Sequence, residues 1–322
     1  MTMKELAKLA NVSVSAVSKA FNEADDISES TKQHIFALAK EYGCYGKFYK
    51  GKYPKKIIAV ICPELVSSYY TCFVDILRRL IEDAGHLCIV SADSFSSARQ
   101  AELVDYFMSY LKVDGMIVFH LKSAPKKGQD KPIISLFANA RGYVNSVNVD
   151  IREAIFNTLE IVMQYGHSKI AFLGEPLTRI KANCFQEAAE ALNCQDVCII
   201  ESKERFEKAG EDGVRQLLET HPDTTAIICA YDNIAYGAIR QLKKAGLQVP
   251  QDVSVVGIDN ISSSTHTKPA LTSIDTQPEE VCRIAWELLQ GKLQNNYRPR
   301  QNIMIKTRLV LRESLDQVRQ SK

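Results

Sequence analysis

The chain has 322 residues, of which 46% are hydrophobic and 24% are charged. These values are ordinary for a globular protein with a sizeable core, and no uninterrupted apolar run is long enough to span a bilayer. The formal net charge is +2, but residues 1–56 hold ten lysines against six acidic residues, or +4, so the remaining chain carries −2. A basic amino-terminal segment on a mildly acidic body is typical of a protein whose first segment alone meets a polyanion.

Residues 2–21 predict two short helices joined by a tight turn, the outline of a helix-turn-helix. Thr2 and Glu5 have the spacing of a capping box, which satisfies two backbone amides at a helix start. Asn11 suits the left-handed conformation that ends a helix, and Ser13 is a natural N-cap for the second helix. The sequence therefore favours a DNA-binding head, while an ordinary amphipathic helical hairpin remains the alternative on these residues alone.

The second of these helices is predicted to face outward on mostly short side chains, which would let it sit deep in a groove. The outward residues are Val14, Ser15, Ser18 and Lys19. A third helix over residues 28–42, capped by Ser28 and ended by Gly43, would close the head.

Residues 46–56 predict a basic, aromatic hinge or linker between the head (1–45) and a core (57–322). Glycines at 46 and 51 and a proline at 54 oppose a stable isolated helix. Lys47, Lys50 and Tyr53 are candidates for contacts with DNA, because lysines pair with phosphates and aromatic rings stack or wedge between bases. A flexible tether explains the same residues equally well.

From residue 57 the chain alternates short apolar runs with helical patterns, and this alternation restarts near residue 153. The predicted strands are 57–62, 87–91, 115–119, 132–137, 169–174, 197–201, 226–230, 253–258 and 303–311. The predicted helices are 69–84, 97–111, 153–165, 184–192, 211–220, 234–245 and 278–289. Such alternation predicts an α/β fold with two Rossmann-like lobes of parallel sheet, each covered by helices on both faces. Ligands bind such folds in a crevice at the carboxyl ends of the strands.

The sequence offers no catalytic or metal-binding pattern, so we expect no catalytic residue, metal or cofactor. GxSxG, HExxH, P-loop and GxGxxG motifs are missing, and the six histidines are dispersed. The nine cysteines are scattered without a CxxC pair, which favours free thiols in a reducing compartment over disulfides. Charged residues from Lys4 onward argue against a secretion signal, so the sequence predicts a cytoplasmic protein.

Several motifs occur in an order that resembles the LacI family of bacterial transcriptional regulators over nearly the whole chain. They are KELAKLANVSVSAVSKAFN at the start, VDG at 113–115, YGHSKIAFLG at 165–174, the run from YDNIAYGAI to VVGIDN at 231–260, PALTSIDTQ at 269–277 and LVLRES at 309–314.

The resemblance implies a periplasmic-binding-protein-like core in which the chain crosses between lobes near 144–147, 274–276 and 301–304. The N-lobe would then be about 57–146 and 276–302, and the C-lobe about 147–275 and 303–322. The resemblance also implies a repressor that binds pseudo-palindromic operator DNA as a homodimer, since two heads address two half-sites. Its effector would be a sugar or another small metabolite. A solute-binding protein with the same core, or a regulator controlled by a protein partner, are the alternatives.

By the same resemblance, Val14, Ser15 and Lys19 fall where the family reads base edges, and Ser13 and Asn22 fall where it contacts phosphates. Lysine at 19 replaces a commoner arginine, and a lysine is a point charge and not a two-pronged donor. The residues that fall in the family's effector crevice are Tyr69, Tyr70, Phe137, Arg179, Lys181, Tyr231 and Asp259. These residues bring more aromatic surface and fewer bidentate hydrogen-bonding groups than the family usually has.

Overall fold

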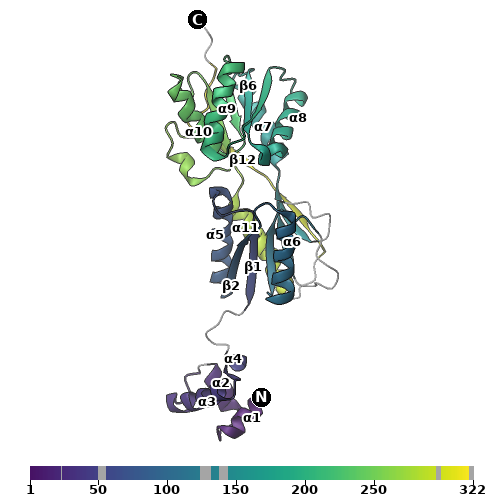
Figure 1. Ribbon diagram of the computed structural model, residues 1–322, viewed down its shortest axis with the longest axis vertical. Helices are drawn as coiled ribbons and strands as arrows, with labels where there is room; N and C mark the ends of the chain where they lie inside the picture. Colours follow the sequence, from purple (N-terminus) through teal and green to yellow (C-terminus); the bar gives the residue numbers. More distant parts are fainter. Residues whose placement is uncertain (23, 50–55, 124–131, 138–143, 295–298, 319–322) are drawn as a thin grey trace.

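A helical head and two α/β lobes follow one another along the long axis of the computed structural model (Figure 1). The structure describes residues 1–22, 24–49, 56–123, 132–137, 144–294 and 299–318. Each lobe contains one six-stranded sheet, and all but one of the strand pairs are parallel. The predicted fold class is confirmed.

The head contains α1 (Met3–Leu9), α2 (Val14–Phe21), α3 (Glu29–Glu41) and α4 (Tyr45–Phe48). The predicted capping box is present: the Thr2 amide donates to the Glu5 carboxylate at 2.7 Å, and the Glu5 amide donates to the Thr2 hydroxyl at 3.3 Å. Asn11 has φ 54°, the left-handed conformation expected of it, and it directly follows Ala10, the C-cap of α1. Leu6, Val17 and Ile35 are fully buried and hold the first three helices together.

The head extends beyond its predicted end at residue 45. Phe48 and Tyr49 are each only 8% exposed, because they pack with Tyr45 against Phe21 and Phe36 of α2 and α3. The ring centroids are 5.6 Å apart for Phe21 and Phe48, 5.6 Å for Phe36 and Tyr49, and 4.9 Å for the stacked Tyr45 and Tyr49. The aromatic residues up to 49 therefore belong to the core of the head and not to the linker.

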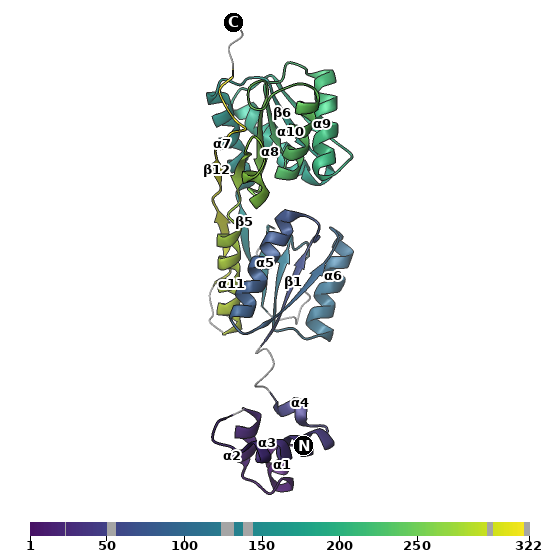
Figure 2. The same cartoon turned by 90° about the vertical axis from the view of Figure 1, so that its left-hand side faces the viewer.

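The N-lobe sheet has the strand order β11-β5-β4-β3-β1-β2, and its recorded pairings are all parallel. Its strands are β1 (Ile57–Cys62), β2 (Leu87–Ala92), β3 (Gly115–Phe119), β4 (Ile133–Leu136), β5 (Asn145–Val149) and β11 (Asn302–Ile305). Helices α5 (Ser68–Asp83) and α11 (Pro278–Leu293) pack together on one face. Helix α6 (Ser97–Asp105), continued by a π-helical turn (Tyr106–Tyr110), covers the other face (Figure 2).

The C-lobe sheet has the order β12-β10-β9-β8-β6-β7, in which only the β10–β12 pair is antiparallel among the described pairs. Its strands are β6 (Ile170–Gly174), β7 (Val197–Glu201), β8 (Ala226–Cys229), β9 (Ser254–Ile258), β10 (Thr272–Asp275) and β12 (Arg308–Val310). Helix α7 (Ile151–Gln164) packs on α8 (Arg179–Ala191), and α9 (Phe206–Thr220) packs on α10 (Asp232–Lys244).

Two of the three predicted crossings between lobes lie a few residues too early in the chain. Strand β5 pairs with β4, and β11 pairs with β5, so both strands belong to the N-lobe sheet. The chain therefore leaves the N-lobe after Val149 and again after Ile305. The predicted strand 303–311 divides accordingly into β11 and β12, which lie in different sheets. The third crossing falls between β10 and α11, close to its predicted place.

Candidate effector pocket and DNA-binding surface

A cavity of about 280 Å³ lies between the two lobes, at the carboxyl ends of strands from both sheets. Glu64, His120 and Phe137 follow β1, β3 and β4 of the N-lobe, while Glu175 and Asp259 follow β6 and β9 of the C-lobe. The other lining residues are Ser67, Tyr69, Tyr70, Phe95, Asn148, Val149, Ile151, Leu177, Thr178, Ile180, Lys181, Arg205, Phe206, Tyr231 and Thr276. The crevice thus lies where a pair of parallel sheets is expected to bind a ligand.

Six of the seven residues predicted for this crevice line the cavity, and Arg179 does not. The six are Tyr69, Tyr70, Phe137, Lys181, Tyr231 and Asp259. Arg179 points into solvent with 70% of its side chain exposed, and its Nε and Nη2 donate to Glu201 at 2.9 and 3.0 Å. Arg179 and Lys181 are two positions apart on α8, and side chains at that spacing point away from each other on a helix. Only Lys181 can therefore face the cavity.

The N-lobe wall of the cavity contains His120, and its hydrogen bonds indicate which ring nitrogen carries the proton. His120 Nδ1 lies 3.1 Å from the Phe137 carbonyl oxygen, which can only accept, so Nδ1 carries the hydrogen. Nε2 of the neutral ring is then an acceptor, and the Tyr70 hydroxyl donates to it at 3.2 Å. Burial lowers the pKa of His120. Tyr70 is thereby held against the wall of the cavity by an uncharged imidazole, which the sequence analysis did not identify.

The C-lobe wall of the cavity carries a half-buried lysine and a buried aspartate. Lys181 Nζ donates to the Ala230 carbonyl oxygen at 2.7 Å and lies 3.6 Å from Asp259 Oδ1. The Asp259 side chain is only 7% exposed, and burial raises its pKa to about 7. The Lys181 charge opposes that rise without cancelling it, because burial is the larger effect on the aspartate.

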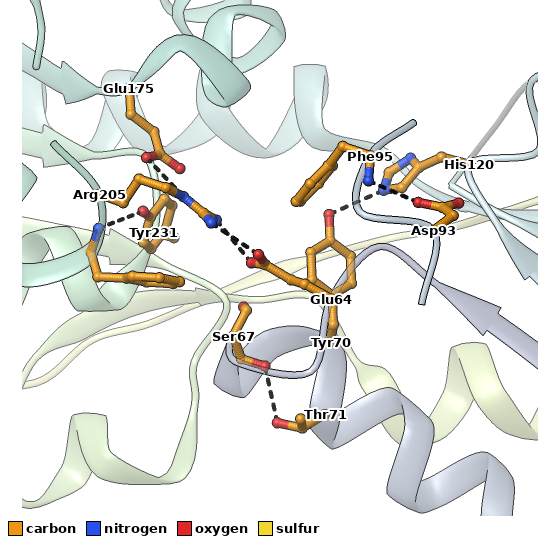
Figure 3. Close-up of polar contacts among 11 residues, drawn as sticks. Glu64, Ser67, Tyr70, Thr71, Asp93, Phe95, His120, Glu175, Arg205 and Tyr231 are labelled. Atoms are coloured by element: carbon orange, nitrogen blue, oxygen red, sulfur yellow. Dashed lines mark hydrogen bonds and ion pairs between the residues drawn. The ribbon is translucent and has the colours of Figure 1, made fainter. Parts of the chain in front are cut away.

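An ion pair joins the two lobes at the cavity, and neither of its residues was identified from the sequence. Arg205 Nη1 and Nη2 donate to the two carboxylate oxygens of Glu64 at 2.9 and 2.8 Å (Figure 3). Arg205 Nε also lies 3.4 Å from Oε2 of Glu175, a side chain that is 2% exposed. The guanidinium carbon lies 4.6 Å from the centre of the Phe206 ring and 5.9 Å from that of Phe95. We call Glu64 and Arg205 the interlobe ion pair.

Neighbouring hydrogen bonds fix the loop that carries Arg205. The Phe206 amide donates to the Tyr231 hydroxyl at 3.0 Å, and Phe206 has φ 55°, an uncommon conformation for a side chain of its size. Burial raises the pKa of Glu175, while Arg205 opposes that rise. A position directly after a strand was the sequence signal that could have identified Glu64 and Glu175. No local pattern marks Arg205, which lies 141 residues from Glu64.

In the head, α2 presents the predicted DNA-reading residues to solvent. Val14 is 42% exposed, and Ser15 and Lys19 are exposed. The Lys19 ammonium is bonded to the carboxylate of Asp26, which lies in the loop before α3. A surface hollow between α1 and α2 is lined by Lys4, Ala7, Lys8, Asn11, Val12, Ser13 and Val14.

Of the remaining residues predicted to contact DNA, some lie in the part of the chain that the structure describes and others do not. The Ser13 hydroxyl accepts from the Ala16 amide at 3.0 Å and so caps α2, and Asn22 donates to the Ser18 hydroxyl at 3.4 Å. Lys47 Nζ donates to the Met1 carbonyl oxygen at 3.0 Å, which directs this lysine toward the start of α1. Lys50 and Tyr53, and with them most of the predicted hinge, lie outside the described residues.

None of the helices in the described part of the chain has the length and apolar character of a membrane span. The described side chains also form no group of three or more His, Cys, Asp or Glu residues that could hold a metal ion. The nine cysteines are free thiols.

Comparison with known proteins matches both parts of this architecture. Residues 2–45 match the model of the lacI family of bacterial regulatory proteins, and residues 160–315 match the periplasmic binding protein-like domain. The HTH-type transcriptional repressor CytR of Escherichia coli (strain K12) is 24% identical over 328 residues, which cover 97% of this chain and 96% of the relative. The HTH-type transcriptional repressor PurR of Salmonella paratyphi B is 26% identical over 340 residues, with coverages of 98% and 96%.

Solved structures share the fold at similar distances in sequence. The lac repressor dimer bound to operator and the anti-inducer ONPF has a TM-score of 0.77 at 22% identity, and 98% of each chain is covered. The complex of the transcriptional regulator CelR with cellobiose has a TM-score of 0.68 at 22% identity, with 98% of this chain and 99% of that chain covered. From the match of its head, the architecture of its core and relatives that span almost its full length, the chain belongs to the LacI family of bacterial regulatory proteins.

Proposed function

We propose that the chain is a transcriptional repressor that binds operator DNA as a homodimer and responds to a small molecule in the interlobe cavity. The observation that carries this proposal is the presence, in one chain, of a solvent-facing α2 with short side chains and a cavity between two hinged lobes. The relatives CytR and PurR are named transcriptional repressors, and the solved lac repressor is a dimer on its operator. A repressor acts where bacterial DNA is, so the proposed compartment is the cytoplasm.

The head supplies the DNA contacts in this proposal. Val14, Ser15 and Lys19 face the major groove and read base edges, because they are exposed on the side of α2 away from the buried Val17 and Ala20. The helix start and the flanking polar groups hold the phosphate backbone, which positions α2 without selecting a sequence. The phosphate-contacting residues are Ser13, Ser18, Asn22 and Lys47. Lys50 and Tyr53 stay proposed contacts of the linker.

A mobility shift with the full chain and DNA from upstream of its own coding region tests the DNA-binding part. Ser15→Glu places a negative charge on the outward face of α2 and should abolish the shift. Ser30→Glu is the matched control, because it adds the same charge at an exposed position in the first turn of α3, where a negative charge is favourable. No shift with the wild-type chain at low salt, or an equal loss in both variants, would contradict the proposal.

The cavity favours an effector that combines an apolar ring face with hydrogen-bond donors. Tyr69, Phe137 and Phe206 supply ring surface, while both cations of the cavity already have acceptors on the protein. Asp259 Oδ1 has no hydrogen-bond donor in the described part of the chain, so this cavity offers a buried acceptor to a ligand. Hydroxyl or amine groups would bind Asp259, and an additional carboxylate on the ligand would find no free partner. Sugars and other small metabolites with donor groups fit this description.

Isothermal titration of the full chain against sugars, nucleobases and amino acids tests the effector part. At pH 8, where most of Asp259 is ionised, Asp259→Asn should weaken the binding of any compound that binds the wild-type chain by about tenfold or more. A hydrogen bond to a charged group contributes about 1.5–3 kcal/mol. Glu201→Gln, on the surface of the same lobe, should leave the affinity unchanged. A ligand that binds with the same affinity to both variants would place its site elsewhere.

A further inference from the structure

Arg205 is held by groups from both lobes at once. Glu64 follows β1 and Phe95 follows β2 in the N-lobe, whereas Glu175 follows β6 and Phe206 begins α9 in the C-lobe. In Figure 3 the guanidinium lies between the carboxylates of Glu64 and Glu175, with Phe95 on the N-lobe side of the same space. The arginine thus connects four elements of the crevice through contacts within the chain.

The geometry of this contact is that of a strong pair. The two N–H groups meet the two oxygens of Glu64 in the parallel arrangement that matches a guanidinium to a carboxylate. Glu64 is 13% exposed and Glu175 is 2% exposed, so water screens this pair less than it screens a surface pair. Removal of Arg205 would leave the carboxylates of Glu64 and Glu175 without their shared counter-ion, whereas removal of Glu64 would leave Arg205 paired only within the C-lobe. Either change removes the attraction across the crevice.

We propose that the interlobe ion pair closes the crevice in the ligand-free protein. Two lobes joined by crossing segments close when groups on their facing surfaces attract one another, and here the chain supplies both groups itself. The closed state is then populated without effector, and an effector reaches the cavity only after Arg205 has left Glu64. Closure by the ion pair is a property of the chain alone. Its consequence for regulation rests on the proposed function, because it sets the state of the core from which DNA binding is controlled.

Energy transfer between one dye on each lobe tests this proposal in the full chain. A ketone-bearing amino acid at Ala101 on α6 and at Lys208 on α9 places the dyes on two exposed helix positions and leaves the nine cysteines untouched. Labelled chains are mixed with an excess of unlabelled chains, so that a dimer carries one labelled copy. The measurement follows the high-transfer population of the protein without ligand.

Glu64→Gln and Arg205→Gln should each remove most of the high-transfer population. The double variant should lose no more than the stronger single variant, because both substitutions break the same contact. Glu201→Gln is the matched control, since it breaks another bidentate pair, with Arg179, that lies wholly within the C-lobe. This control should keep the wild-type distribution. An unchanged distribution in both Glu64→Gln and Arg205→Gln, additive losses in the double variant, or an equal loss in the control would overturn the proposal.

A mobility shift on the same preparations separates this proposal from the proposed function. If the wild-type chain binds no DNA but the single variants lose the high-transfer population, the ion pair closes the crevice of a protein with another role. If the wild-type chain shifts its upstream DNA and the variants keep the wild-type transfer, the repressor stands and the ion-pair proposal fails.

Discussion

The Lys181 ammonium lies 3.6 Å from Oδ1 of Asp259, beyond the distance of a good hydrogen bond, although both groups line a buried part of the crevice. The ammonium of Lys181 donates a hydrogen bond to the Ala230 carbonyl oxygen at 2.7 Å. The aspartate is therefore left with incomplete compensation for its burial, and burial raises its pKa to about 7 from an ordinary value of 3.8. This relationship makes the stability of the core depend on pH.

We expect the free energy of unfolding to fall as pH rises from about 5 to about 8. Between the two pKa values the folded chain keeps a proton on Asp259 that the unfolded chain has released, so the folded state binds more protons and loses stability as pH increases. For a shift of this size the loss amounts to about 3 kcal/mol over that range. Asp232, whose pKa burial raises to about 6, contributes in the same direction. Urea unfolding at several pH values measures the combined change in the free energy of unfolding.

Asp259→Asn isolates the contribution of Asp259, because an amide does not titrate and Asp232 stays in both proteins. The difference between the two pH profiles should therefore show the slope that Asp259 causes. Parallel profiles for the wild-type chain and the variant would mean that Asp259 is ionised in the folded protein throughout this range.

The close approach of α9 and α10 gives a second prediction. A Cβ atom at Gly237 would lie 1.8 Å from the Glu207 carbonyl oxygen, and one at Gly210 would lie 2.0 Å from the Ile234 carbonyl oxygen. Gly237→Ala should therefore force the two helices apart and destabilise the C-lobe by about 2–3 kcal/mol in urea unfolding. Gly291→Ala on α11 is the control, because no atom lies within 4 Å of the added carbon. It should be neutral or slightly stabilising, and an equal effect at both positions would contradict the packing argument.

The strands that were predicted correctly are those whose local pattern is strong. Ile57–Cys62 is a continuous apolar run that is almost wholly buried, as expected for a central parallel strand. Asn145–Val149 and Thr272–Asp275 consist mostly of polar residues without a regular alternation, and they were not recognised as strands. Their place in the sheets depends on pairing with partners elsewhere in the chain, which a local pattern does not contain. The shifted lobe boundaries follow from this.

Some residues of the crevice could likewise be predicted from the sequence, whereas others depend on contacts between distant parts of the chain. The family resemblance predicted Lys181 and Asp259 in the crevice, and both line the cavity. The position of Arg179 depends on the register of α8, which begins at that residue. Glu64 and Arg205 meet across 141 positions of sequence, so only the folded chain brings them together. Tyr45 and Tyr49 lie in a segment whose glycine and lysine content is typical of a linker. They pack against Phe21 and Phe36 of the head, which the local sequence does not indicate.

Lys19 is expected to contribute to sequence recognition. Lys19→Ala should weaken binding to the operator much more than binding to unrelated DNA, because a base-edge contact is lost only on the specific sequence. Fluorescence anisotropy at one salt concentration measures both affinities. Lys8→Ala, a lysine on α1 whose loss changes the net charge equally, should lower the two affinities by similar factors. An equal loss on both DNAs for Lys19→Ala would remove this lysine from the base-reading set.

Asp26 competes with DNA for the same lysine. Its carboxylate is bonded to the Lys19 ammonium, and it brings a negative charge to the side of α2 that we propose faces DNA. Asp26→Asn should therefore strengthen operator binding, by about threefold to tenfold at low salt. The gain is limited because such an exposed ion pair is weak, and the charge effect is screened as salt increases.

Asp25→Asn is the control for this gain, because it removes the same charge one position away and no ion pair with Lys19 is recorded there. A gain of the same size in Asp25→Asn would show that net charge alone, and not release of Lys19, causes the change.

The aromatic residues after α3 should stabilise the whole head. Phe48 is 8% exposed and packs on Phe21 at 5.6 Å, so Phe48→Ala removes a buried ring from a small core, at a cost of about 3 kcal/mol. We expect faster amide hydrogen exchange in α1, α2 and α3, weaker operator binding, and unchanged exchange in the two lobes. Tyr42→Ala is the matched control in the same head, because this ring is 50% exposed. Equal exchange in the two variants would return residues 46–49 to the linker, whereas the expected difference makes them part of the DNA-binding domain.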